Sequence, residues 1–218
     1  MTGKRHRKPP ARTRLRRPAR ATSRERMLEA AQALFARDGY EATSTAAICR
    51  LAGTSQSQLM KHFCGKQGLL AAIFEHAWRQ VNPAIRLAIE KLSAPAEKAR
   101  TVMNMMLAFL EREPAVRKLL LLEGRRIRGR RRLVTVVPGY VEFVATLDGI
   151  LRETAAHRQL RRGISPLALR SALIGAVEGM LRDKLIAQAA GSKAEFDEAE
   201  VRAVFQALLA CSFSSERR

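Results

Sequence analysis

Apolar residues recur along most of this chain at the three- and four-residue spacing of an amphipathic helix. The composition agrees, because Ala, Leu, Arg and Glu are abundant and aromatic residues make up only 5% of the sequence. One strand-like stretch occurs at residues 133–137, but it ends at Pro138 and we expect no partner hairpin for it. The sequence therefore predicts an all-α fold, with residues 133–137 in a loop or at a helix start.

The net charge is +20, from 40 Lys and Arg against 20 Asp and Glu. Such an excess favours a polyanionic partner, with nucleic acid ahead of an anionic membrane. Residues 1–26 hold eleven basic residues and one acidic residue, which is half of the excess. Residues 1–21 contain three prolines and almost no large apolar side chain, so we expect a disordered basic arm there. It either reaches the DNA minor groove or serves only as a solvating tail.

No apolar segment is long enough to span a membrane, and no apolar region follows the basic N-terminus as it would in a secretory signal. We therefore expect a cytoplasmic protein. The three cysteines, Cys49, Cys64 and Cys211, are odd in number and lack CxxC spacing, which argues against a disulfide framework or a zinc site. We expect neither a metal nor a cofactor.

Three helices are predicted in the first folded segment. The first has an N-cap at Thr22 or Ser23 and ends at Gly39, the second ends at Gly53, and the third begins at Ser55. Two short helices joined by a glycine-containing turn and supported by a longer helix make a helix-turn-helix module.

The third of these helices is polar over most of its surface. Only Leu59 and Phe63 anchor it strongly, and its outer side carries Gln56, Ser57, Lys61 and His62. A helix that enters the major groove is held along one edge and exposes groups that can contact bases and phosphates. An ordinary solvated helix has the same polarity, so the DNA-binding interpretation depends on the surrounding helix order and the basic arm.

The motifs in this region are RMLEAAQALFARDGY at 26–40, TST at 43–45, AGTS at 52–55 and HF at 62–63, together with Ile48, Leu59, Lys66, Leu69 and Leu70. They resemble the N-terminal signature of the TetR family of bacterial transcriptional regulators. The resemblance implies an all-helical homodimer with an N-terminal DNA-binding domain of three helices. The remaining helices would bind a ligand and hold the dimer together.

The resemblance also implies functional residues by position. It places phosphate contacts on Ser44, Thr45 and Lys66, and groove contacts on Thr54, Gln56, Ser57, Lys61 and His62. Met60 stands where the family usually has a tyrosine, so a phosphate-contacting hydroxyl is missing there. The chain is expected to divide into a basic arm at 1–21, a helix-turn-helix domain at 22–66, a helical regulatory and dimerisation domain at 67–213 and a tail at 214–218.

Two features of the second domain suggest binding sites. Met103, Met106 and Phe109 lie on the apolar side of a predicted helix, where they form either plain core or the wall of an adaptable ligand cavity. The run GRRIRGRRR, from Gly124 to Arg132, holds six arginines. We interpret it as a solvated loop or helix face, with a patch for an anionic ligand, a partner or distal DNA as the alternative.

The C-terminal helices are candidates for the dimer interface. A stripe of small residues in the helix that begins at Pro166 would let another helix approach closely: Ala172, Gly175, Ala176 and Gly179. This helix and the last one, from two subunits, would form a four-helix interface. Alternatively, both helices only complete the core of the monomer.

The sequence contains no paired histidine motif, phosphate-binding glycine loop or nucleophile elbow, so we expect no enzyme. Two binding functions remain. The first is a repressor that holds a palindromic operator in double-stranded DNA as a homodimer and is released by a small-molecule inducer in its C-terminal domain. The second is an architectural or nucleoid-associated DNA-binding protein without an inducer.

Overall fold

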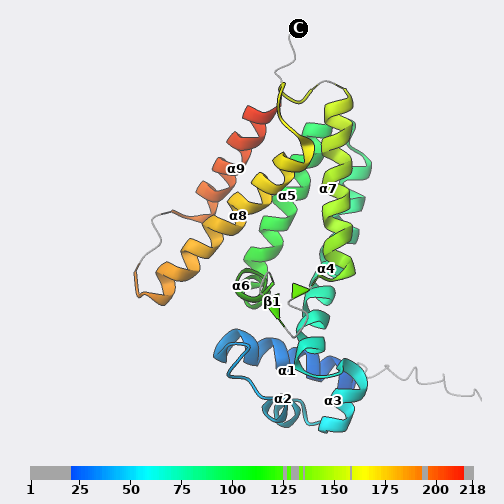
Figure 1. Ribbon diagram of the computed structural model, residues 1–218, viewed down its shortest axis with the longest axis vertical. Helices are drawn as coiled ribbons and strands as arrows, with labels where there is room; N and C mark the ends of the chain where they lie inside the picture. The colour runs from blue at the N-terminus through cyan, green and yellow to red at the C-terminus, as the bar shows by residue number, and fades with distance from the viewer. Residues whose placement is uncertain are drawn as a thin grey trace, which may run out of the picture.

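The computed structural model describes residues 21–124, 127–128, 133–134, 136–157, 159–192 and 196–213. Within these ranges the chain forms nine α-helices and one pair of very short strands (Figure 1). The elements are α1 (Ser23–Asp38), α2 (Thr45–Ala52), α3 (Gln56–Phe63), α4 (Lys66–Glu90), α5 (Pro95–Arg112), α6 (Pro114–Glu123), β1 (Ile127–Arg128), β2 (Leu133–Val134), α7 (Pro138–Ala156), α8 (Pro166–Ala189) and α9 (Glu198–Ser212). The predicted all-α fold is confirmed.

Several sequence predictions lie outside the described residues. They are the basic arm up to residue 20, the tail at 214–218, and the side chains of the arginine run after Gly124. None of the helices in the described ranges has the length and hydrophobicity that a membrane span requires.

The expectation that residues 133–137 lack a strand partner is wrong. Leu133 and Val134 pair in antiparallel register with Arg128 and Ile127. A ladder of two residues has little intrinsic stability, and its partner strand is a two-residue segment within the arginine run, so the pattern of residues 133–137 could not reveal it. The remainder of the expectation holds, because Val137 is the N-cap of α7.

Side-chain caps set the start of α1. The Thr22 hydroxyl accepts a hydrogen bond from the Glu25 backbone N–H at 3.2 Å, and the Glu25 carboxylate accepts one from the Thr22 backbone N–H at 2.7 Å. This capping box satisfies two backbone donors that the helix leaves unpaired. The hydrogen bonds from Thr22 also hold the pKa of Glu25 below its usual value. Of the two predicted N-caps, Thr22 is therefore the one used.

The two short helices end in left-handed backbone conformations. Gly53 follows α2 with φ of 60°, and Cys64 follows α3 with φ of 56°. Ser44 and Ser55 cap the beginnings of the two helices. The register of each helix is thus fixed at both ends by local chemistry.

Figure 1 shows α1, α2 and α3 together at one end of the molecule, and α5, α7, α8 and α9 at the other end. The helix α4 runs from the first group to the second, and α6 packs against α1. The Lys118 ammonium of α6 donates to the carbonyl of Ala36 near the end of α1, at 2.6 Å. A continuous hydrophobic core extends through both groups.

The helices α4 and α7 meet closely at Gly139. The Gly139 N–H donates to the Glu75 carboxylate at 2.9 Å, and the Asn82 side-chain amide donates to the Gly139 carbonyl at 2.8 Å. A side chain at residue 139 would overlap Cβ of Trp78. Only glycine therefore allows the start of α7 to sit on the aromatic side of α4.

We expect Gly139→Ala to lower the free energy of unfolding by about 1–3 kcal/mol, because the added methyl group forces α7 away from Trp78. The matched control is Gly149→Ala in the same helix, where the new methyl group meets no atom within 4 Å. That change should raise stability by about 0.5–1 kcal/mol through the unfolded state. Urea unfolding measures both, and equal shifts in the two variants would contradict the tight contact at Gly139.

Candidate nucleic-acid interface and ligand cavity

The outer face of α3 is the centre of the candidate interface. Leu59 and Phe63 are buried against the core, as the helical periodicity predicts. The four polar residues of its outer side, Gln56, Ser57, Lys61 and His62, are all exposed. An anchored helix with a polar outer face has the form needed to enter a major groove.

The N-terminus of α2 flanks this helix. Ser44 is exposed, and its hydroxyl accepts a hydrogen bond from the Ala47 N–H at 3.1 Å. Thr45 is the first residue of the helix. Helix N-termini attract phosphate because the first backbone N–H groups have no acceptor within the helix. Ser44 and Thr45 therefore lie where a DNA backbone contact is physically reasonable.

Thr54 is the least accessible of the residues expected to contact the groove. It is half-buried, and its hydroxyl oxygen is buried without a hydrogen-bond partner in the described part of the chain. Its backbone N–H donates to the Cys49 carbonyl at 3.0 Å, which fixes the turn between α2 and α3. Because the Thr54 hydroxyl is buried at this turn, it would have to become exposed before it could contact a base.

Lys66 has a structural partner that the sequence did not reveal. Its ammonium donates to the carbonyls of Tyr40 and Glu41, at 2.8 and 3.3 Å, and lies 4.4 Å from the centre of the Tyr40 ring. Lys66 thus ties the start of α4 to the link between α1 and α2. An ammonium has three donors, so a phosphate contact would share this group with the two carbonyls.

Two residues near α3 were not assigned a DNA contact from the sequence. The Arg24 guanidinium lies 5.3 Å from the centre of the Phe63 ring and places a positive charge beside α3. Met60 projects from α3 with 55% of its surface exposed. Cation–π contact and exposure depend on tertiary packing, so helical periodicity could not identify either residue.

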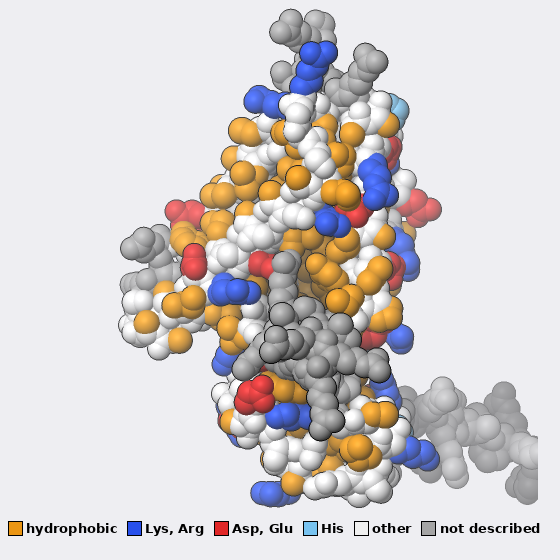
Figure 2. All heavy atoms as spheres, in the orientation of Figure 1, with side chains coloured by type: hydrophobic (Ala, Val, Ile, Leu, Met, Phe, Trp, Pro, Cys, Tyr) orange, Lys and Arg blue, Asp and Glu red, His pale blue; other side chains and the backbone are white. Residues whose placement is uncertain are grey.

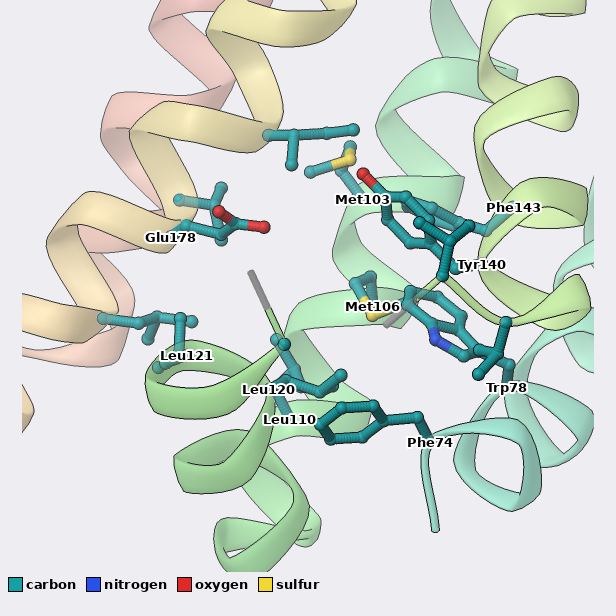
Figure 3. Close-up of a pocket in the computed structure, with 16 residues that line it drawn as sticks. Phe74, Trp78, Met103, Met106, Leu110, Leu120, Leu121, Tyr140, Phe143 and Glu178 are labelled. Carbon is teal, nitrogen blue, oxygen red and sulfur yellow. The ribbon is translucent and has the colours of Figure 1, made fainter. Parts of the chain in front are cut away.

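A cavity of about 540 Å³ lies in the second domain (Figure 3). Its walls come from α4, α5, α6, α7 and α8, with contributions from residues 136 and 137. Trp78, Tyr140 and Phe143 form one side, and the carboxylate of Glu178 points into the cavity from α8 opposite them. Glu178 is the one charged residue among the described lining residues. The volume of this cavity and its mostly apolar lining are typical of sites that bind largely apolar small molecules.

The three candidate ligand residues divide between two cavities. Met103 and Met106 line the large one. Phe109 instead lines a smaller cavity of about 350 Å³, together with Val81 and Met105. The apolar stripe of α5 is wide enough to face neighbours on two sides, so residues three positions apart point into different spaces. The aromatic wall from α7 was missed because Tyr140 lies far from Met103 in the sequence.

Two helices connect this cavity with the α1–α3 group. The helix α6 contributes Leu120 and Leu121 to the cavity and binds α1 through Lys118. The helix α4 contributes Phe74 and Trp78, and it begins at Lys66 beside the α3 helix. A change in the cavity can therefore reach the α3 surface through direct packing.

The small-residue stripe of α8 is largely uncovered in the single chain. Ala172, Gly175 and Gly179 are exposed, and Ala176 is half-buried. On α9, Val204 and Leu208 are also exposed, and Figure 2 shows hydrophobic side chains gathered over this part of the molecule. The opposite sides of both helices are buried. These helices complete the core and also present an apolar face.

Comparison with known proteins finds a family model that matches part of the chain. Residues 27–73 match the family described as bacterial regulatory proteins, tetR family. Among curated proteins, the nucleoid occlusion factor SlmA of Vibrio campbellii is 26% identical over 168 residues, which cover 72% of this chain and 81% of that protein. SlmA of Sodalis glossinidius is 28% identical over 168 residues, which cover 72% and 80%.

Solved structures share the whole fold. The transcriptional regulator FadR from Bacillus subtilis, in complex with stearoyl-CoA, superimposes with a TM-score of 0.73 and 18% identity, covering 84% of this chain and 96% of that one. SmeT, the repressor of the Stenotrophomonas maltophilia multidrug efflux pump SmeDEF, gives a TM-score of 0.69 and 23% identity, covering 90% and 92%. At these identities the likeness extends to the fold alone.

We expect Lys66→Ala to lower the free energy of unfolding by about 1–3 kcal/mol, because it removes charge-assisted hydrogen bonds to Tyr40 and Glu41. If the ammonium also meets phosphate, binding to all DNA sequences should weaken to a similar extent. The slope of log affinity against log salt, which is negative, should then decrease in magnitude by about 0.9. Lys61→Ala, which removes an exposed lysine on α3, should also reduce the magnitude of the slope, but without loss of stability. An unchanged slope in Lys66→Ala would assign that lysine to structure alone.

Proposed function

We propose that this chain, whose residues 27–73 match the tetR family of bacterial regulatory proteins, is a ligand-responsive transcriptional repressor of that family. A homodimer would hold a palindromic operator, and a small molecule in the large cavity would release it. The observation that carries this proposal is the contact of α4 and α6 with both the cavity and the α1–α3 group. The matched family is described as regulatory, and the sequence contains no catalytic motif, so we propose a binding function and not an enzymatic one.

The α3 helix is the element we assign to base recognition, and the start of α2 with Lys66 to the DNA backbone. Gln56 can pair with adenine, and Ser57, Lys61 and His62 can meet base edges or phosphates. We propose the matching division of the chain into a basic arm, a DNA-binding domain and a regulatory domain. The helix α4 begins at the end of the DNA-binding domain and continues into the regulatory domain.

The homodimer is proposed to form through the apolar face of α8 and α9. Gly175 and Gly179 present no side chain there, so the backbones of two facing helices can approach closely. A two-fold axis through this face and parallel to the long axis of the molecule would place two copies of α3 at the same end of the assembly. For two half-sites on the same face of DNA, the α3 helices must lie about 34–36 Å apart.

The inducer is proposed to be a largely apolar molecule. Aromatic and aliphatic side chains form nearly all of the described cavity wall, so most of the binding free energy would come from apolar burial. The similar fold of FadR holds stearoyl-CoA, and that of SmeT belongs to a repressor of a multidrug efflux pump. That a protein of similar fold holds stearoyl-CoA, which carries a long apolar chain, supports an apolar ligand for this chain.

For the ligand to release the dimer from DNA, it must bind more tightly when the two α3 helices do not match the operator than when they have the DNA-competent spacing. A molecule between Trp78 and Leu121 would press on α4 and α6 together. Because both helices contact the α1–α3 group, a change in their separation alters the direction in which α3 projects. The predicted result is a spacing that no longer matches one helical turn of DNA.

The second candidate function is an architectural or nucleoid-associated DNA-binding protein. The curated relatives are nucleoid occlusion factors, and the net charge of +20 favours extensive phosphate contact. A measurement of sequence discrimination distinguishes the two candidate functions better than a measurement of DNA affinity does. A specific regulator prefers its operator over random DNA by about a thousandfold or more.

The test of the proposed function is selection from random DNA duplexes with the purified full chain near physiological salt, followed by sequencing. We expect enrichment of a palindrome with two half-sites. Tight binding with no enriched sequence would overturn the specific-regulator proposal and favour the architectural function.

Gln56→Ala should relax the base preference at one position of each half-site. A bidentate pair between glutamine and adenine contributes about 1–3 kcal/mol of discrimination, so the preference there should fall roughly tenfold or more. Affinity for unrelated DNA should stay unchanged. A second selection with the variant measures the preference, with Gln80→Ala, an exposed glutamine of α4, as the control. Unaltered preference in Gln56→Ala would exclude Gln56 from base recognition.

Met106→Trp should fill part of the large cavity. We expect binding of the neutral apolar dye Nile red, followed by its fluorescence, to weaken about tenfold because the larger ring occupies its space. Met105→Trp makes the same change at a residue that faces the smaller cavity, and it should leave dye binding nearly unchanged. Equal losses in both variants would argue against the large cavity as the ligand site.

A further inference from the structure

Met60 is the one large apolar side chain on the outer face of α3. It is 55% exposed, whereas Leu59 and Phe63 are 1% and 6% exposed. A single exposed apolar side chain is ordinary on a protein surface, so its exposure alone assigns nothing. Its position is informative, because it lies one turn after Gln56 and directly before Lys61, within the proposed recognition surface.

The orientation of Met60 is fixed by both ends of its helix. The Ser55 hydroxyl accepts from the Gln58 N–H at 3.3 Å at the start of α3. The Met60 carbonyl accepts from the Cys64 N–H at 3.0 Å at its end. Burial of Leu59 and Phe63 determines the rotation of the helix about its axis. Met60 therefore cannot turn into the core without displacing these anchors.

The neighbouring residue leaves the thioether uncovered. Gly65 has φ of 110°, a backbone conformation that side-chain-bearing residues rarely adopt. A side chain at that position would begin 4.0 Å from the Met60 sulfur, in van der Waals contact with it. Because glycine stands there, the end of the Met60 side chain faces solvent and is accessible to a bound surface.

The chemistry of methionine restricts what this side chain can recognise. A thioether donates no hydrogen bond and accepts only weakly, so it cannot hold a phosphate or pair with a polar base edge. The apolar feature of the major groove is the C5-methyl group of thymine. We propose that Met60 is a specificity-determining residue that contacts a thymine methyl group in each half-site. This inference rests on the proposed function, because it requires α3 to enter the major groove.

The geometry of α3 also indicates where that thymine lies. Residues four positions apart on a helix are separated by about 6 Å along its axis. Successive base pairs are separated by about 3.4 Å. A helix lying along the groove therefore places the thymine read by Met60 within about two base pairs of the base that Gln56 contacts.

The test replaces thymines of the selected operator one at a time with deoxyuridine, which removes only the C5-methyl group. For the unchanged protein we expect one position in each half-site where this weakens binding about three- to fivefold, the effect of one buried methyl group. In Met60→Ala the same replacement should have no effect, while Met60→Leu should retain most of it. Fluorescence anisotropy measures the dissociation constants.

Leu87→Ala serves as the matched control, because Leu87 is 66% exposed on α4 outside the candidate interface. It should show the thymine dependence of the unchanged protein. Circular dichroism should show the same helical content for all variants, since Met60 and Leu87 lie at the surface. The inference is overturned if every thymine-to-uracil effect in Met60→Ala equals that in the unchanged protein. The selection is completed before any uracil is introduced. If it enriches no operator, the proposed function itself is overturned.

Discussion

The stretch of α4 between Lys66 and Trp78 is the constraint on which the arrangement depends. Pro83, which has no N–H, interrupts the backbone hydrogen bonding of α4 only beyond this stretch. The twelve residue steps from Lys66 to Trp78 span about 18 Å, so one unbroken piece of helix joins the end of α3 to the aromatic side of the cavity. Lys66 fixes its first turn to the link before α2. Trp78 lies about three turns further along, where α7 packs closely on the helix. A displacement at either position is therefore felt at the other.

Charge and apolar burial act on different parts of the molecule. The excess of +20 raises affinity for any DNA, whereas sequence discrimination needs the few side chains that α3 holds in register. The cavity, by contrast, is nearly free of charge along its described walls, apart from Glu178. Under the proposed function, a ligand in the apolar cavity and DNA on the basic surface would therefore compete through conformation and not through shared contacts.

The sequence predicted what depends on local chemistry and missed what depends on distances between helices. Caps and glycines such as Thr22 and Gly53 located the ends of the first helices nearly to the residue, because they act within a few positions. The cavity is different, since its walls meet only after α4, α7 and α8 have packed. Phe109 shares an apolar stripe with Met106 yet faces another space. The structural role of Lys66 was likewise hidden, because its partners lie 25 and 26 residues away.

The two helices that join the cavity to α1–α3 are held by different contacts. Around Gly139, α4 is joined to α7 by two hydrogen bonds. Within the described part of the chain, α6 is joined to α1 by the hydrogen bond from Lys118 to the Ala36 carbonyl, and its Leu121 carbonyl accepts a hydrogen bond from the Arg182 guanidinium of α8 at 2.8 Å. Both helices are thus tied to the second domain beside the cavity. Under the proposed function, a ligand that widens the cavity would displace α6 from α4, and the Lys118 contact would carry that displacement to α1.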